Sequence, residues 1–280
     1  MTESRKGFRM RLSPARKVVL EMMHHARKVP SLPIARKCDL SAVAAARREA
    51  MAPPSWTAIM MRAYGLVARD YPELRRALIP WPWTHLYQHP CSECAILVER
   101  VWQDEKVILG AKLRAPEDRP LAEIDSHLRH LQSAPVIEIN YFRQVLRLGR
   151  LPWLLRRFTF WQSLYLSGFT RAKRFGTFMI SSLGNLGAEQ LHPLTPLTTY
   201  FTFGRIADDG EAELKIVYDH RVLDDRCVAR ALRDLEQVLN HDLSAELERC
   251  GPAAPCRGGV DTLPSSPDRL RACPTRRKRW

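Results

Sequence analysis

The chain has 280 residues, 45% hydrophobic and 26% charged, which is enough for a sizeable core in one large domain or two small ones. Its formal net charge is +14, from 44 Lys and Arg against 30 Asp and Glu, and such a balance attracts polyanions or phosphorylated ligands. No stretch reaches 18 apolar residues free of charge, and no apolar segment follows the basic N-terminus, so the sequence argues against a membrane-spanning helix and a secretory signal and favours a cytoplasmic protein.

The seven cysteines are scattered and odd in number, which argues against a disulfide framework. Cys91 and Cys94 form a CxxC, and His85 and His89 lie just upstream. A structural zinc site needs four ligands, and no second CxxC or paired histidine lies at a suitable spacing. We therefore expect no metal site, and we expect these two cysteines to lie at the start of a half-buried strand.

Helices dominate the first part of the chain. Each expected helix follows a proline or a capping residue such as Ser55 and carries apolar residues on one face. The expected helices cover residues 14–29, 41–50, 56–74 and 121–132, and most of the stretch 136–170. We expect the Pro- and Trp-rich residues 80–90 to form a loop.

Strands dominate the later part of the chain. Runs of β-branched and aromatic residues predict strands at 94–100, 106–114 and 177–184, then an antiparallel pair at 198–206 and 212–222. A last helix is expected over about 225–240. Strands that follow one another beside separate helices indicate an α+β fold.

The domain boundaries follow from composition. We expect a flexible N-terminus over residues 1–10, a single catalytic domain over 11–247, and a disordered, basic, Pro-rich tail over 248–280. Residues 139–188 contain eight Arg or Lys and no Asp or Glu. That stretch is either a solvated basic face or a wall that faces the phosphates of a bound cofactor.

The densest chemical signal is the segment YDHRVLDD, from Tyr218 to Asp225. His220 ends a predicted strand, and Asp224 lies four residues later at a helix start, where the helix dipole stabilises a negative charge. An imidazole there can take a proton from a thiol or hydroxyl, although many strand-end histidines only bond a carbonyl. Ser181 and Ser182 lie beside glycines in a strand-turn and could stabilise an oxyanion, or they could form a plain turn.

These motifs resemble the catalytic domain of the dihydrolipoyl acyltransferase component of the 2-oxoacid dehydrogenase complexes, whose fold is shared with chloramphenicol acetyltransferase. The family's DHRVxDG motif is matched by residues 219–225, and its TFTISSLG strand by residues 177–184. Weaker matches begin with Arg16 in the first helix, and the resemblance covers roughly residues 10–245. It implies a two-layer sandwich, with a mixed sheet and helices packed on one face.

The resemblance also implies roles for individual residues. His220 matches the general base that deprotonates coenzyme A, and Ser181 matches the hydroxyl that stabilises the oxyanion. Asp224 matches the acid that maintains the site, and Arg16 is its candidate salt-bridge partner. The implied function is direct acyl transfer between coenzyme A and an acceptor. The implied assembly is a homotrimer with its sites between subunits.

Departures from the family pattern keep an alternative open. The glycine after the family acid is Asp225 here, and the match leaves no room for a lipoyl domain, so we expect no covalently bound lipoate on this chain and a separate lipoyl-bearing or acyl-acceptor partner. A catalytically degenerate trimeric scaffold of the same fold is the alternative function. A basic binder of nucleic acid or anionic lipid is the third hypothesis, but no nucleic-acid motif supports it. The residues that bind coenzyme A are not identified by the sequence.

Overall fold

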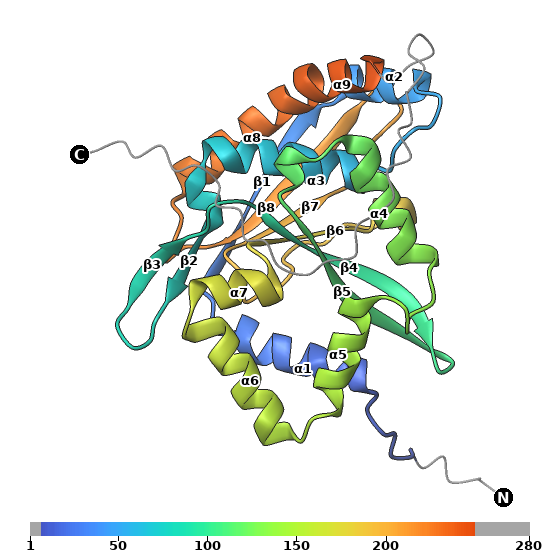
Figure 1. Cartoon of the computed structure of the whole chain (residues 1–280). Helices are drawn as coiled ribbons and strands as arrows, with labels where there is room; N and C mark the ends of the chain where they lie inside the picture. The colour runs from blue at the N-terminus through green and yellow to red at the C-terminus, as the bar shows by residue number, and fades with distance from the viewer. Residues whose placement is uncertain (1–6, 250–280) are drawn as a thin grey trace, which may run out of the picture.

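The structure is a computed structural model, and it describes residues 7–249. Its centre is a mixed six-stranded sheet with the order β1-β8-β7-β6-β4-β5 (Figure 1). β6 runs parallel to both of its neighbours, and the other neighbouring pairs are antiparallel. The strands are β1 (Ser31–Asp39), β4 (Glu93–Trp102), β5 (Glu105–Arg114), β6 (Phe178–Ser182), β7 (Thr199–Phe203) and β8 (Glu211–Asp219). The predicted α+β class with a mixed sheet is therefore confirmed.

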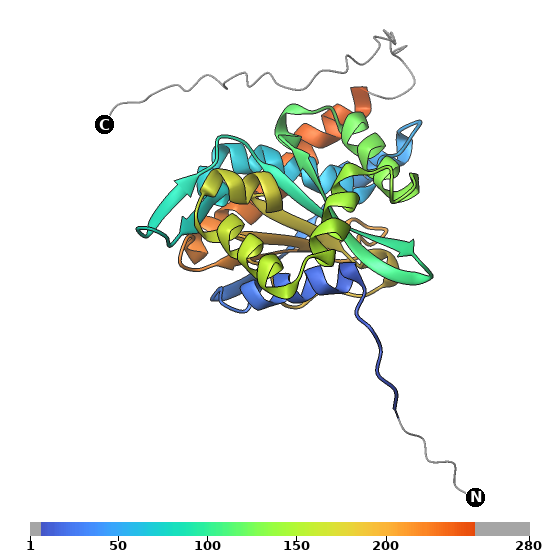
Figure 2. The same cartoon turned by 60° about the horizontal axis from the view of Figure 1, so that its bottom comes forward.

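Helices lie on both sides of this sheet, whereas the sequence placed them on one (Figures 1 and 2). One side carries α2 (Ser41–Glu49), α3 (Trp56–Asp70), α4 (Leu121–Ser133), α8 (Asp225–Val238) and α9 (Ser244–Arg249). The other side carries α1 (Pro14–Ala26), α5 (Asn140–Arg150), α6 (Trp153–Tyr165) and α7 (Gly168–Phe175). The correction has a simple cause, because strands that are apolar on both faces need a cover on both faces.

The two faces of the sheet carry different side chains, because successive strand residues point to opposite sides. On the α3 face, Phe178 belongs to the main core, and the ring of Tyr64 stacks on it at 4.1 Å between centroids. On the other face, Met179 and Tyr200 form a smaller cluster against Met22 of α1. The same alternation sends Ser181 and Ser182 to opposite faces.

The second strand of a two-stranded sheet lies in the segment that we expected to be a loop, and the first strand comes just before that segment. β2 (Arg76–Ile79) pairs with β3 (His85–Gln88) in an antiparallel hairpin, and the connection contains Trp81 and Trp83. Four-residue strands are too short to show a clear alternation in sequence. Residues 1–6 of the expected flexible N-terminus (1–10) and residues 250–280 of the expected tail (248–280) lie outside the described residues.

The sequence predicted a mainly helical stretch over residues 136–170. The structure has three separate helices in this basic part of the chain, α5 to α7. Across residues 7–249, no helix combines the length and the apolar character that crossing a bilayer requires.

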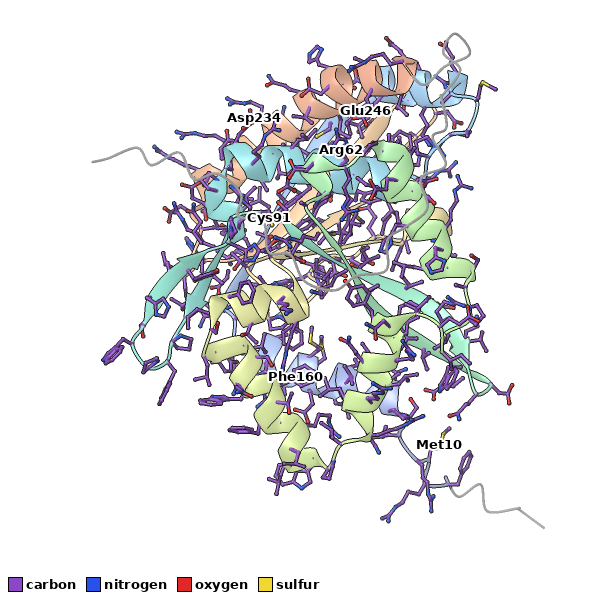
Figure 3. All side chains as sticks on the ribbon, viewed as in Figure 1. Met10, Arg62, Cys91, Phe160, Asp234 and Glu246 are labelled. Atoms are coloured by element: carbon purple, nitrogen blue, oxygen red, sulfur yellow. The ribbon has the colours of Figure 1, made fainter. Side chains whose placement is uncertain are left out.

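A buried carboxylate attaches α6 to α1. Glu21 of α1 is 3% exposed and accepts hydrogen bonds from Nε of Arg156 at 3.3 Å and from Nε of Arg157 at 2.5 Å. Phe160 faces the same interface, and its ring stacks on that of His25 at 5.9 Å (Figure 3). Because Arg156 is itself buried, removal of Glu21 would leave a cation without compensation in the interior.

We expect Glu21→Ala to lower the free energy of unfolding by about 3–5 kcal/mol, the usual cost of breaking a buried ion pair. Urea denaturation followed by circular dichroism would measure it. Glu211→Ala is the matched control, because the pair of Glu211 with Lys37 is largely exposed and is expected to contribute about 0–1 kcal/mol. Equal losses in the two variants would show that Glu21 does not hold α6 in place.

Candidate active site

His220 follows the last residue of β8 and lies in the turn that leads into α8. Its backbone N–H donates to the carbonyl of Pro30, and its Nδ1 lies 3.0 Å from the carbonyl oxygen of Leu223. A carbonyl only accepts hydrogen bonds, so Nδ1 carries a hydrogen, and in the neutral imidazole Nε2 is then the nitrogen with the lone pair. The side chain is 45% exposed, so this basic nitrogen is accessible to a ligand.

The turn around His220 is held by an ion pair between a buried carboxylate and a partly exposed arginine. Asp219 is 1% exposed, and its carboxylate accepts from the Nε of Arg221 at 2.9 Å and from a terminal guanidinium nitrogen of the same residue at 2.8 Å. The carboxylate also accepts from the backbone N–H of Arg221 at 3.0 Å. The carbonyl of Asp219 accepts from the N–H groups of Val222 and Leu223. These bonds fix the backbone on both sides of the imidazole.

A buried cation, Arg171 of α7, lies near this pair. Its guanidinium donates to the carbonyls of Leu78 at 2.9 Å and Pro196 at 2.7 Å. Burial lowers the pKa of Arg171 to about 10, and the charge of Asp219 opposes that shift. The guanidinium therefore stays charged at neutral pH, and Asp219 is the carboxylate that balances it.

The two acids after the turn have different surroundings. Asp225 accepts a hydrogen bond from the phenol of Tyr218, and its Oδ1 lies 3.7 Å from Nε2 of His220. Burial, together with this bond, raises the pKa of Tyr218, so the phenol stays protonated. Asp224 occupies the N-cap of α8 with an exposed side chain that makes no capping hydrogen bond.

An open cavity of about 860 Å³ lies between this turn, the C-terminal end of α3 and the first turns of α8. His220 and Leu223 line it. Its charged lining residues have both signs: Arg76, Arg226 and Arg230, against Asp70, Glu73, Asp224 and Asp225. The volume falls within the range of small-molecule sites, and both anionic and cationic groups of a ligand would find partners there.

Ser181 and Ser182 have different hydrogen-bond partners and therefore different roles. The hydroxyl of Ser182 donates to the carbonyl of Phe203 at 2.9 Å and accepts from the N–H of Gly184 at 3.1 Å, so it shapes the turn after β6. Ser181 points to the opposite face and shares a hydrogen bond with the phenol of Tyr200, whose pKa is raised by burial. Of the two, Ser181 is the candidate for bonding a ligand.

Ser181 and His220 do not meet within one chain. Ser181 lies opposite Thr202, which lies opposite Lys215, five residues before His220 along the chain. At about 3.4 Å per residue and about 4.8 Å per strand, the two positions are roughly 20 Å apart. They cannot act on the same carbonyl unless two copies of the chain meet.

Arg16 and Asp224 are not brought together either. Arg16 is exposed in the first turn of α1, whereas the C-terminal end of α1 is the one that leads toward the turn of His220. No ion pair joins Arg16 to Asp224 within the described part of the chain. The pair next to the histidine is Asp219 with Arg221 instead.

Sequence reasoning did not single out Arg171, Arg221 or Tyr218. The signal for Arg221 was present, because it directly follows the histidine in the motif. Arg171 stood among the basic residues of a stretch without acids, and nothing in a sequence separates a buried arginine from an exposed one there.

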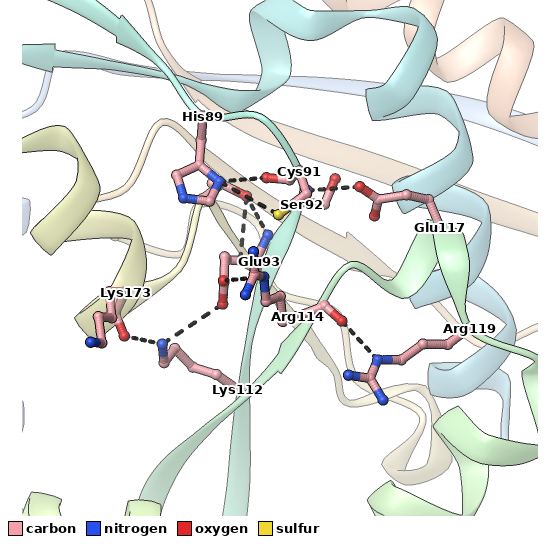
Figure 4. A network of polar contacts seen from close by, with 10 residues as sticks. His89, Cys91, Ser92, Glu93, Lys112, Arg114, Glu117, Arg119 and Lys173 are labelled. Atoms are coloured by element: carbon pink, nitrogen blue, oxygen red, sulfur yellow. Dashed lines mark hydrogen bonds and ion pairs between the residues drawn. The ribbon is translucent and has the colours of Figure 1, made fainter. Parts of the chain in front are cut away.

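Cys91 lies just before β4 and Cys94 near its start, as expected, and Cys91 belongs to a network of polar contacts (Figure 4). Nδ1 of His89 lies 2.7 Å from the carbonyl of Cys91 and 3.9 Å from its sulfur. Burial raises the pKa of both thiols, so they stay protonated. Among residues 7–249, no group of three His, Cys, Asp or Glu side chains could hold a metal ion.

No protein-family model matches this sequence, and no curated protein matches it. Solved structures do. The dihydrolipoamide acetyltransferase of Azotobacter vinelandii superimposes with a TM-score of 0.62 at 17% identity, over 86% of this chain and 94% of that one.

Two further structures agree. The truncated catalytic core of the 2-oxoacid dehydrogenase complex from Thermoplasma acidophilum gives 0.57 at 16% identity, over 84% of this chain and 99% of that one. The cubic core of the pyruvate dehydrogenase complex gives 0.56 at 15% identity, over 86% and 94%. The fold of this chain is therefore that of the dihydrolipoamide acetyltransferase catalytic core, as the sequence motifs predicted.

Proposed function

We propose that this protein is an acyltransferase that moves an acyl group between coenzyme A and an acceptor, with His220 as the general base. The observation that carries the proposal is the imidazole itself. Its Nδ1 hydrogen is committed to the carbonyl of Leu223, and its Nε2, 3.7 Å from the carboxylate of Asp225, belongs to a side chain that lines an open cavity. The Azotobacter vinelandii enzyme, which shares the fold, was studied for the role of a serine, a histidine and an asparagine in its catalytic mechanism.

The proposed reaction needs no covalent enzyme intermediate. Nε2 of His220 takes the proton of the attacking thiol, and the sulfur forms a bond to the acyl carbonyl carbon. The negative charge then moves to the carbonyl oxygen, where the hydroxyl of Ser181 donates a hydrogen bond. When the bond to the leaving group breaks, the proton on Nε2 passes to that group, and the imidazole returns to its first state.

The site requires a second copy of the chain. Because His220 and Ser181 are roughly 20 Å apart in one chain, we place the Ser181 of a neighbouring copy opposite each His220. A homotrimer supplies this arrangement three times by symmetry. The likeness to the cubic core of the pyruvate dehydrogenase complex supports an assembly of this kind. The acceptor, or a lipoyl group carried by another protein, would enter from the opposite subunit.

One observation favours the alternative, a degenerate scaffold. The carboxylate of Asp225 lies 3.7 Å from Nε2, where the thiol must approach, and the motif of the family has glycine at that position. The phenol of Tyr218 donates a hydrogen bond to the same carboxylate oxygen and so disperses part of its charge. We propose that Asp224, the exposed residue at the N-cap of α8, helps to maintain the turn.

We expect His220→Ala to lower kcat by roughly 10²–10⁴-fold, the usual contribution of a general base. Steady-state release of free coenzyme A from acetyl-CoA, with a dihydrolipoamide acceptor, would measure it. His130→Ala, an exposed histidine on α4, is the control and should leave kcat unchanged. Equal rates for wild type and His220→Ala would refute the mechanism.

Mixed assemblies test the shared site. His220→Ala and Ser181→Ala chains are each expected to be nearly inactive alone, since loss of an oxyanion donor costs roughly 10²–10³-fold. Co-assembled after refolding together, they should recover roughly a quarter of the wild-type activity, because each interface draws its two chains at random. No recovery, with trimers confirmed by analytical ultracentrifugation, would place both residues in a site within one chain.

Binding of coenzyme A separates the two functions. Calorimetry should show micromolar binding to the wild type, and equal or tighter binding to Asp225→Gly, which removes a negative charge beside the site. Binding to the glycine variant alone would favour the degenerate scaffold. If neither protein binds, the proposed substrate is wrong.

A further inference from the structure

Helix α6 turns a charged residue inward and large apolar residues outward. Arg156 is 8% exposed and bonded to Glu21, and Phe160 is fully buried beside it. The outward residues are between 56% and 62% exposed: Trp153, Leu154, Leu155 and Phe158. A helix on the surface of a globular domain has the opposite arrangement. Something outside the described chain is therefore expected to cover this side.

The apolar surface continues from α6 onto the loop between β2 and β3. The ring of Trp161 stacks on Phe158 at 6.0 Å and meets that of Trp81 at 6.3 Å. Trp81 is 54% exposed and Trp83 is 80% exposed. We call this surface the aromatic face, and it consists of Trp81, Trp83, Trp153, Leu154, Leu155, Phe158 and Trp161.

Arginines without ion-pair partners flank the aromatic face. Arg143, Arg147 and Arg150 follow one another at helical spacing along the exposed side of α5, which leads directly into α6. Within residues 7–249, none of the three has an acidic partner, and the whole stretch 139–188 contains no acid. The C-terminal end of α5 is joined to the start of α6 by a short connection, so Arg150 adjoins the Trp153 end of the aromatic face.

The segment before α1 repeats this chemistry. Phe8, Met10 and Leu12 are 84%, 76% and 51% exposed and alternate with Arg9 and Arg11. The segment leaves the protein beside α5, because Gly149 of α5 packs directly against the backbone of Pro14 (Figure 2). It therefore extends the cationic and apolar surface.

We propose that the aromatic face docks on the surface of an anionic lipid membrane, apart from the proposed catalytic function. Tryptophan and phenylalanine side chains partition into the boundary between headgroups and acyl chains, and flanking arginines bond lipid phosphates. A two-fold contact between two copies through this face would bring the same arginines together without an acid to balance them, and a head-to-tail contact within the proposed trimer is the competing occupant, which analytical ultracentrifugation distinguishes. Charge complementarity therefore selects anionic lipid as the occupant.

Flotation of the full-length protein with vesicles tests this docking. The wild type should float with vesicles of phosphatidylcholine mixed with phosphatidylglycerol, and not with phosphatidylcholine alone. Leu154→Asp/Phe158→Asp should weaken binding by about tenfold or more, because it places charges in the inserted face. Met51→Asp/Val101→Asp is the matched control, since it makes the same change at two exposed apolar residues elsewhere and should bind as the wild type does.

A second pair of variants probes the charges. Arg147→Gln/Arg150→Gln should lower binding roughly 30-fold, because each arginine near an anionic surface contributes about fivefold. Arg48→Gln/Arg69→Gln removes the same charge elsewhere and should bind like the wild type.

Several results would overturn the proposal. The proposal fails if the wild type does not float with anionic vesicles, or if both aspartate variants bind as it does. It fails too if Leu154→Asp/Phe158→Asp splits the assembly in analytical ultracentrifugation while the wild type ignores vesicles, since the face is then a contact between subunits. Acyl transfer to a soluble acceptor is measured separately, so failure here leaves the proposed function untouched.

Discussion

The hydrogen bonds of one buried carboxylate, Asp219, determine the geometry of the candidate site. It is the last residue of β8, where it holds Arg221 and balances the charge of Arg171. A buried carboxylate with fewer partners would be costly, so the surrounding cations and backbone donors are needed to keep the turn in place. The orientation of His220 follows from that turn, because both neighbouring peptide groups are already bonded. Arg171 also ties the site to the helices on the far side of the sheet.

The sheet separates the two proposed catalytic residues, His220 and Ser181. β8 delivers the histidine at one end, and β6 delivers the serine at the other end and on the opposite face. The main core lies on the side of α3 and α8, and the side of Ser181 keeps polar residues such as Tyr200 and Lys215 within an otherwise apolar sheet. Polar side chains on that face fit the proposal that a neighbouring subunit and a ligand bind there.

Much of the fold could be predicted from the sequence, because its signals are local. The alternation in β4 to β8 and the long apolar face of α8 predicted these elements, and the two motifs around Ser181 and His220 indicated how they are arranged. The hairpin of β2 and β3 was missed, since four-residue strands carry little pattern. The helices on the second face were predicted as helices, but their position was not, because a helix with Arg156 inside and Leu154 outside gives a misleading apolar face.

The site was predicted less completely, for a physical reason. His220 and Ser181 are identified by residue type and neighbouring motif. Their separation depends on strand order and register, which no local pattern specifies. The expected partner of Asp224 was a charged residue far along the chain, and Arg16 lies at the wrong end of its helix. Arg171 and Tyr218 became visible only through burial and bonding.

The separation of Ser181 from His220 has a consequence for inheritance and for dosage. If every site is built from two copies, a single defective chain disables the sites on both of its sides, so a variant with an inactive histidine and an inactive serine would act dominantly over normal copies. Dilution would have a similar effect, since activity per chain would fall as soon as the assembly came apart. The catalytic unit of such a protein is the boundary between neighbours, and the folded chain supplies only its two edges.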